Sequence, residues 1–110
     1  MDQDALDNIM KAGAVTREAR KLGAGMIAEG VSLLSVAEET EAYIRKKGAK
    51  PAFPVNISIN QIAAHYTPAS NDASTFRRGD VVKLDVGAHV NGYMDLATLA
   101  TSWKMAFLQW

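Results

Sequence analysis

Apolar residues recur at helical spacing along the first thirty positions of the chain, mostly at steps of three and four. The residues that carry this pattern are Leu6, Ile9, Met10, Val15, Ala19, Leu22 and Met26. The pattern predicts one helix over residues 2–29, ended by Gly30, which can adopt a positive φ. Gly13, Gly23 and Gly25 lower the intrinsic helix propensity, so we expect tertiary packing to support this helix.

A second helix is indicated by the polar residues at both of its ends. Ser35 and Glu38 have the spacing of a capping box, in which each side chain accepts a hydrogen bond from the backbone N–H of the other residue. Acidic residues are concentrated at positions 38–41 and basic residues at 45–47, an arrangement that suits the helix dipole. The sequence therefore predicts a helix capped at Ser35 and ended by Gly48.

In the second half of the chain the hydrophobic period changes to two. Val55, Ile57 and Ile59 alternate with polar residues, which is typical of a half-buried β-strand. A polar, turn-rich connection is predicted over residues 67–74, and another turn over residues 78–80.

A β-hairpin is predicted next. Residues 81–90, VVKLDVGAHV, have the composition of a strand. Asn91-Gly92 indicates a type I′ turn, because both central residues of such a turn need a positive φ. A returning strand is expected over residues 93–101. Two helices followed by an antiparallel sheet predict an α+β fold.

Composition and charge exclude several classes of function. The chain has 110 residues, which suits one domain, and its twelve basic residues balance twelve acidic ones. No global charge therefore favours nucleic acid or an anionic membrane as partner. The absence of cysteine removes disulfides, zinc–thiolate sites and cysteine nucleophiles. We expect a cytoplasmic protein, because the sequence has no signal-peptide pattern and no apolar run of roughly 18 residues.

Asp85 is the residue whose surroundings are most informative. It lies inside an apolar strand, where an ionised carboxylate is costly unless a cation or hydrogen-bond donors compensate. Asp95 lies across the hairpin, and two carboxylates on adjacent strands can hold a pair of divalent ions for hydrolysis. Asp85 can equally face solvent or be satisfied by nearby amides, because one face of an antiparallel sheet is often wet.

Three other residues are weaker candidates on local grounds. His65 lies where a strand is expected to enter a loop, and a neutral imidazole there can donate to a substrate carbonyl or a developing oxyanion. A histidine hydrogen-bonded into a strand end is the alternative. His89 has the position of an ordinary hairpin residue, and Phe53 that of a core residue.

The segment from Gly48 to Tyr93 resembles the type II methionine aminopeptidases, most closely the archaeal ones. The resemblance rests on KPAFP, on the SIN and AAHYTP motifs, and on GDVVKLDVGAHVNGY, and it covers about residues 5–93. It implies the pita-bread fold, in which two αβ halves enclose a centre of two divalent metal ions. It also implies removal of the initiator methionine from nascent polypeptides, with cobalt, manganese, iron or zinc as the metal.

The resemblance assigns roles to individual residues of this chain. Asp85 matches the family's first metal-bridging aspartate. His65 matches the histidine near the scissile peptide bond, so a substrate-binding and catalytic role is expected for it. Phe53 matches one wall of the pocket for the methionine side chain.

Asp95 departs from the family pattern by one residue. The family's second metal-binding aspartate lies one position further from the first than Asp95 lies from Asp85. With Asn91-Gly92 as a two-residue turn, residues share a face across the hairpin only when their numbers have an odd sum. Leu96 meets this condition with Asp85, whereas Asp95 does not. We therefore expect Asp95 on the opposite face unless a β-bulge corrects the register.

The resemblance ends near residue 93, and the chain is accordingly divided into two parts. Residues 1–95 are assigned to a partial pita-bread aminopeptidase-like domain, and residues 96–110 to an atypical apolar tail. The family's remaining ligands are a histidine and two glutamates, and no His, Asp or Glu follows Asp95. The 110 residues are therefore expected to be a truncated form that is inactive alone.

Two alternatives to catalysis stay open. One is a non-catalytic interaction module that keeps the fold and holds no metal, and the other is a fragment without a function of its own. The expected partner of an active form is the N-terminus of a nascent polypeptide, with neither nucleic acid nor membrane involved. Self-association through the apolar C-terminal end is a further expectation.

Overall fold

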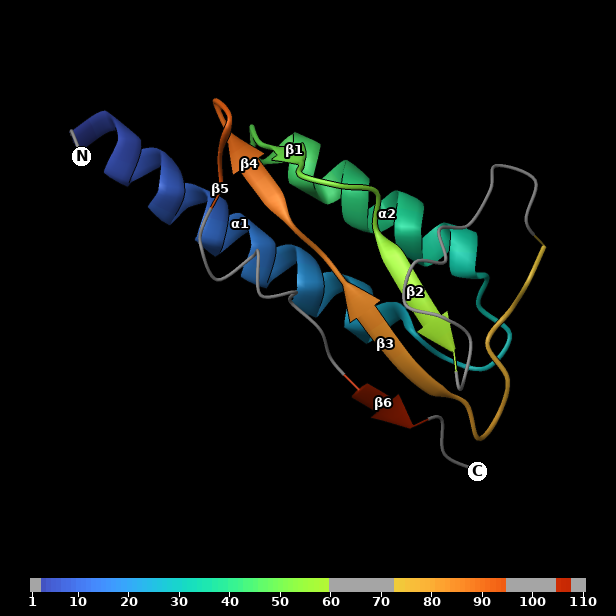
Figure 1. Cartoon of the computed structure of the whole chain (residues 1–110). Helices are drawn as coiled ribbons and strands as arrows, with labels where there is room; N and C mark the ends of the chain where they lie inside the picture. The colour runs from blue at the N-terminus through green and yellow to red at the C-terminus, as the bar shows by residue number, and fades with distance from the viewer. Residues whose placement is uncertain (1–2, 60–72, 95–104, 108–110) are drawn as a thin grey trace.

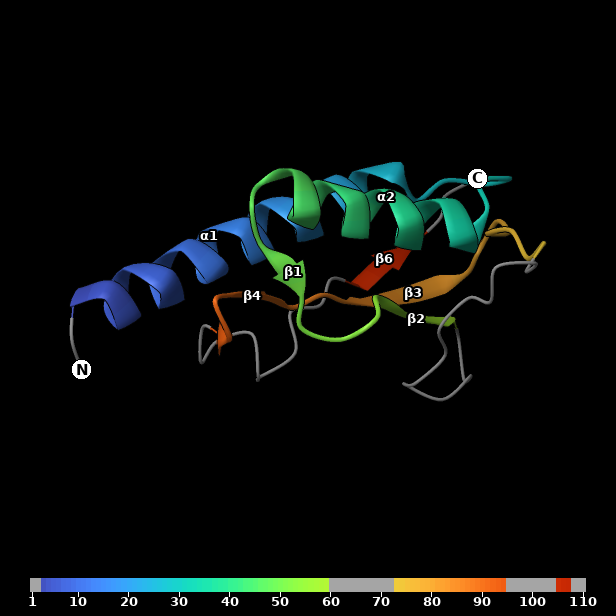
Figure 2. The same ribbon diagram turned by 90° about the horizontal axis from the view of Figure 1, so that it is seen from above.

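In the part of the chain that the structure describes, one layer of two helices packs on one layer of antiparallel strands, which confirms the α+β prediction (Figures 1 and 2). The structure is a computed structural model and describes residues 3–59, 73–94 and 105–107. The elements in chain order are α1 (Gln3–Met26), α2 (Leu33–Lys46), β1 (Lys50–Pro51), β2 (Asn56–Ile59), β3 (Val81–Asp85), β4 (Ala88–Val90), β5 (Tyr93–Met94) and β6 (Met105–Phe107).

Within the described residues, the strands form two three-stranded sheets, ordered β1-β4-β5 and β2-β3-β6. The single strand predicted over residues 81–90 is therefore wrong in one respect: it is divided between the sheets at Val86 and Gly87. The chain changes partner there, because Asp85 ends the pairing with β2 and Ala88 begins the pairing with β1. In Figure 1, β3 and β4 nevertheless follow one another along one line.

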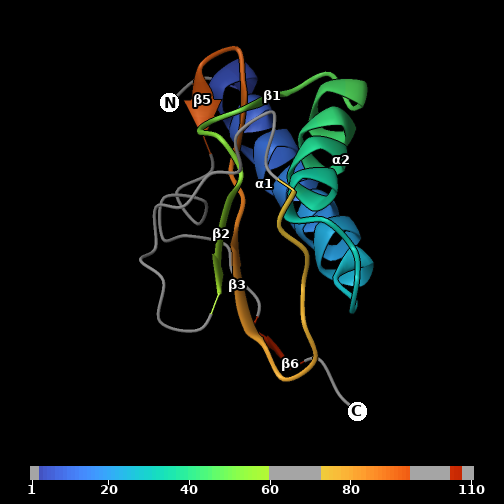
Figure 3. The same cartoon turned by 90° about the vertical axis from the view of Figure 1, so that its right-hand side faces the viewer.

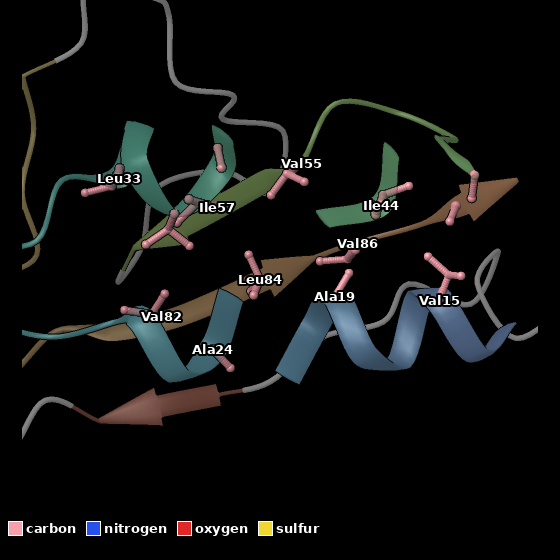
Figure 4. Close-up of a cluster of buried hydrophobic side chains, with 14 of the residues drawn as sticks. Val15, Ala19, Ala24, Leu33, Ile44, Val55, Ile57, Val82, Leu84 and Val86 are labelled. Atoms are coloured by element: carbon pink, nitrogen blue, oxygen red, sulfur yellow. The ribbon is translucent and has the colours of Figure 1, made fainter. Parts of the chain in front are cut away.

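The division does not disturb the alternation of side chains along this stretch. The even-numbered positions from 82 to 90 are all buried, and each is at most 7% exposed. They join the same hydrophobic cluster as the inner faces of the two helices. Figure 4 shows Val86 beside Ala19 of α1, in the cluster that also contains Val82 and Leu84. Side chains at the odd-numbered positions consequently point away from the helices.

The predicted inner face of α1 is partly wrong. Val15 and Ala19 are buried as expected, but Leu6, Met10 and Leu22 are 42%, 63% and 38% exposed. The buried face is instead lined mainly by small residues: Ala5, Ala12, Gly13, Val15, Thr16, Ala19, Gly23 and Ala24. Small side chains allow close approach of a neighbouring backbone, and this approach decides which face is buried.

Gly23 is the point where the closeness matters most. A Cβ atom at this position would lie 2.5 Å from Thr40 Oγ1 of α2 and 3.0 Å from Leu84 Cδ2 of β3. Thr40 is fully buried and donates its hydroxyl hydrogen to the carbonyl oxygen of Val36 at 2.6 Å. Gly23 thus lets α1 pack against both α2 and β3, which compensates for its low helix propensity.

Gly23→Ala is expected to destabilise the chain by about 1–3 kcal/mol, because the added methyl group meets the Thr40 hydroxyl. Gly25→Ala is the matched control, since nothing lies within 4 Å of its Cβ position. Helix propensity alone acts there, so the control is expected to be neutral or stabilising by up to ~1 kcal/mol. Urea unfolding followed by circular dichroism measures both variants. Equal effects of the two substitutions would contradict the tight packing at Gly23.

Two helix ends differ from the prediction: the C-terminal end of α1 and the N-terminal end of α2. α1 ends at Met26, and Gly30 takes its positive φ of 86° in the turn that follows. The cap predicted at Ser35 is wrong, because Ser32 is the N-cap of α2 and its hydroxyl accepts from the Ser35 backbone N–H at 2.9 Å. The helix begins earlier because Leu33 is needed in the core, where it is 1% exposed.

The C-terminal end of α2 is as predicted. Gly48 has a φ of 82° and donates its N–H to the Arg45 carbonyl, and Ala49 donates to the Ile44 carbonyl. This pair of hydrogen bonds is the Schellman motif, and the accompanying apolar contact is provided by Ile44 and Ala49, which are both in the core. The last carbonyls of the helix are therefore satisfied by the backbone.

The predicted hairpin is confirmed where the structure describes it. Asn91 and Gly92 have φ values of 52° and 82°, as a type I′ turn requires. Val90 pairs with Tyr93, and His89 pairs with Met94. Of the returning strand expected over residues 93–101, positions 95–101 lie outside the described residues.

The two helices are also joined by polar groups at the surface. The Tyr43 hydroxyl donates to Glu18 Oε1 at 2.8 Å, and this hydrogen bond to a carboxylate raises the pKa of Tyr43. Figure 3 shows α1 and α2 side by side on one flank of the strands. Neither described helix combines the length and apolar character needed to cross a membrane.

Candidate metal-binding face

The β2–β3 register determines which side chains accompany Asp85. Asn56 is directly opposite Asp85, and Ser58 is directly opposite Lys83. Residues that oppose each other across antiparallel strands project from the same face of the sheet. We call the side turned away from the helices the Asp85 face; it is formed by Asn56, Ser58, Lys83, Asp85 and Gly87.

The polar residues of this face are not in open solvent. Asp85 is 7% exposed, and Asn56 and Ser58 on the neighbouring strand β2 are 9% and 8% exposed. The alternative in which Asp85 faces solvent is therefore wrong. A carboxylate is held in such a place at a cost that hydrogen bonds or a cation must offset.

Phe53 lies next to the same face. The Ala52 N–H donates to the Gly87 carbonyl oxygen at 2.9 Å, which joins the segment before β2 to the backbone between β3 and β4. A Cβ atom on Gly87 would lie 2.5 Å from Phe53 Cε1 and 2.9 Å from Phe53 Cζ. The phenyl ring thus covers the backbone two positions beyond Asp85, and only a residue without a side chain leaves room for it.

The other predicted site residues are placed less completely. His65 and Asp95 lie outside the described residues. His89 lies in β4, where its Nδ1 atom accepts from the Gly92 N–H at 3.3 Å, as suits a hairpin residue. Within residues 3–59, 73–94 and 105–107, no three side chains of His, Asp or Glu come together as a ligand set.

Asn56 and Gly87 were not singled out by the sequence patterns. Asn56 is one of several polar residues in a strand of alternating pattern. The sequence does not determine which residue of β3 lies opposite it. Gly87 had a usable signal, because a glycine inside a strand often marks close approach of another group.

The donor chemistry of this face fits part of a divalent-metal site. A carboxylate oxygen from Asp85 and an amide oxygen from Asn56 are hard donors of the kind that divalent ions accept. Their burial limits competition from water. A complete site needs more ligands than these two residues supply.

The family model for metallopeptidase family M24 matches residues 7–101. The chain belongs to metallopeptidase family M24. It is 53% identical over 94 residues to the methionine aminopeptidase of Archaeoglobus fulgidus and 51% identical over 94 residues to that of Methanocaldococcus jannaschii. In both cases the match covers 86% of this chain and 32% of the relative, so the chain spans about a third of the length of these proteins.

Solved structures of a methionine aminopeptidase and of a prolidase have the same fold. Methionine aminopeptidase from Thermotoga maritima superposes with a TM-score of 0.81 at 21% identity, over 99% of this chain and 45% of the other. Prolidase from Pyrococcus furiosus superposes with a TM-score of 0.76 at 24% identity, over 97% of this chain and 30% of the other. These matches confirm that the two helices and their antiparallel strands form part of the pita-bread fold. Membership of a metallopeptidase family implies the use of divalent metal ions.

Gly87→Ala is expected to destabilise the chain by about 1–3 kcal/mol, because the new methyl group meets the Phe53 ring. The same substitution in a Phe53→Ala background is expected to cost much less, since the ring is then absent. Urea unfolding of the four proteins of this double-mutant cycle measures the coupling between the two positions. Strictly additive effects would contradict the contact between Gly87 and Phe53.

Proposed function

We propose that this chain contributes one wall of a methionine aminopeptidase centre, with Asp85 as a ligand to divalent metal. The observation that carries the proposal is the burial of Asp85 opposite Asn56, on the side of the sheet that the helices leave uncovered. The high identity to archaeal methionine aminopeptidases supports the same assignment.

Each of the chain's own residues has a separate task in this proposal. Asp85 holds metal, and Asn56 beside it supplies a neutral oxygen that orients or completes the coordination. Phe53 forms one wall of the pocket that takes the methionine side chain and keeps water from it. His65 donates a hydrogen bond to the scissile carbonyl as negative charge develops there. The divalent ions, when bound, supply the Lewis acidity for hydrolysis of the peptide bond.

We further propose that these 110 residues do not complete the centre on their own. Val90 pairs with Tyr93, as the two-residue turn at Asn91-Gly92 requires. If the pairing continues with that register, Asp95 projects from the face opposite to Asp85. The remaining histidine and glutamate ligands of the family have no counterpart after Asp95 in this sequence. A second polypeptide segment must therefore supply them.

The substrate proposed for the completed centre is the methionyl N-terminus of a nascent polypeptide. A cytoplasmic location accords with that substrate, and cobalt, manganese, iron or zinc suits the mixed oxygen and nitrogen ligands. A non-catalytic interaction module remains the second candidate, favoured by the one-residue shift of Asp95. Self-association through the apolar C-terminal end would belong to that candidate.

A chimera tests the catalytic proposal. Residues 7–94 of this chain replace the matching segment of the Archaeoglobus fulgidus methionine aminopeptidase, whose own chain supplies everything that follows. With Mn²⁺ or Co²⁺, the chimera is expected to hydrolyse a methionyl peptide, whereas the isolated 110-residue chain is not. Asp85→Asn in the chimera is expected to lower kcat/KM at least about a hundredfold, since even outer-shell partners of metal ligands have effects of about 10–100-fold.

Glu38→Gln is the control, because it removes an exposed carboxylate from α2. It is expected to leave kcat/KM within about twofold, as surface substitutions usually do. Full activity of the Asp85→Asn chimera would contradict the proposed role. Turnover by the isolated chain would contradict the proposal that its centre is incomplete.

The position of Asp95 has its own test in the same chimera. Extending this chain's contribution through Asp95, so that the shorter spacing replaces that of the relative, is expected to abolish measurable hydrolysis. Insertion of one alanine between Met94 and Asp95 is expected to restore activity, because one residue returns the second carboxylate to the Asp85 face. Activity that is independent of the insertion would show that a β-bulge already corrects the register.

A further inference from the structure

A groove of about 560 Å³ lies beyond the last turn of α2. The described residues that line it are Arg45, Gly48, Ala49, Lys50, Pro51 and His89. They come from the end of α2 and the turn after it, from β1, and from β4, which pairs with β1 (Figure 1). None of these lining residues is acidic, although the whole chain has as many acidic as basic residues.

The groove collects hydrogen-bond donors from several elements. Arg45 comes from α2 and Lys50 from β1. Lys11 of α1 reaches the same place, because its Nζ atom lies 3.2 Å from the point that a Cβ on Gly48 would occupy. Three exposed cationic side chains from three elements thus bring positive charge to one groove, and this charge favours an anionic ligand.

His89 adds a donor rather than an acceptor. It is directly opposite Lys50 in the β1–β4 pair, so the two side chains share a face. Its Nδ1 atom accepts from the Gly92 N–H. A neutral imidazole that accepts at Nδ1 carries its proton at Nε2, and Nε2–H is then a donor. Neither Lys50 nor His89 can therefore satisfy the other.

The usual explanation for cations at a helix C-terminus accounts for only part of this arrangement. Basic residues in the last turn interact favourably with the helix dipole, which suffices for Arg45 and Lys46. It does not explain Lys50, His89 or Lys11, which come from other elements. The Schellman hydrogen bonds also satisfy the last carbonyls without side chains. Arg45 remains accessible, because its side chain is 62% exposed and its contact with Glu41 is 3.9 Å long.

We propose that this groove binds a phosphate-type oxyanion carried by a small organic molecule. Arg45, Lys50 and His89 donate to the oxyanion, and Lys11 adds positive charge at the rim. Ala49 and Pro51 provide an apolar wall for the organic part. Guanidinium, ammonium and imidazole groups together form the donor set that phosphate oxygens accept. The inference does not depend on the proposed aminopeptidase function.

The test is titration of the 110-residue chain with inorganic phosphate and with phenyl phosphate at constant ionic strength. Isothermal calorimetry is expected to show saturable binding of both probes, with phenyl phosphate the tighter. Lys50→Ala is expected to weaken binding about tenfold, the effect of losing one charge-assisted hydrogen bond. Lys46→Ala is the matched control, because it removes the same charge from an exposed position that does not line the groove. It is expected to change the dissociation constant less than about twofold.

Two results would overturn the proposal. One is the absence of saturable binding of either probe to the unmodified chain. The other is an equal loss from Lys50→Ala and Lys46→Ala, which would indicate a diffuse basic surface instead of a bounded site. Binding of a single-stranded oligonucleotide that tightens with its length and is weakened equally by both substitutions would have the same meaning.

Discussion

The alternation of side chains along residues 81–90 is the constraint on which the rest of the structure depends. Every even-numbered position from Val82 to Val90 is buried against α1 and α2. Because successive side chains of a strand point to opposite faces, those at the odd-numbered positions project away from the helices. Asp85 and Gly87 face away from the helices because Leu84 and Val86 face toward them. The polar face exists as a consequence of the apolar one.

The same constraint links the helices to the candidate site. At Gly23, α1 packs against Thr40 of α2 and Leu84 of β3. Leu84, the residue before Asp85, therefore packs against the helix layer. On the other side, the Phe53 ring covers Gly87. Two glycines therefore permit two close contacts, one on each face of the strand. Asp85 lies between these contacts along the chain, one residue after Leu84 and two residues before Gly87.

The elements that could be predicted from the sequence are those whose signals are local. The turn at Asn91-Gly92 and the end of α2 at Gly48 each need a positive φ, and the sequence supplies residues that adopt it. Ser35 and Ser32 both offer a capping hydroxyl for α2, and Ser32 is the cap because Leu33 after it is buried. That burial is a tertiary effect.

The inner face of α1 was misjudged for a related reason. Large apolar residues such as Met10 carry the strongest helical periodicity, yet close packing at Gly23 selects the face with small residues. The importance of Asp85 could be predicted from its apolar neighbours, and the resemblance supported it. Its partner Asn56 could not, because the pairing of β2 with β3 joins residues that are far apart in the sequence.

The register of β2 against β3 is the most direct test of this account, and a chain without cysteine allows it to be measured cleanly. Directly opposed residues have Cα atoms about 4.5–5.5 Å apart, within the range of about 4.4–6.8 Å that a disulfide spans. Asn56→Cys combined with Asp85→Cys is expected to form a disulfide under mild oxidation, whereas Ser58→Cys combined with Asp85→Cys is not. A disulfide in the second pair and none in the first would contradict the placement of Asp85 beside Asn56.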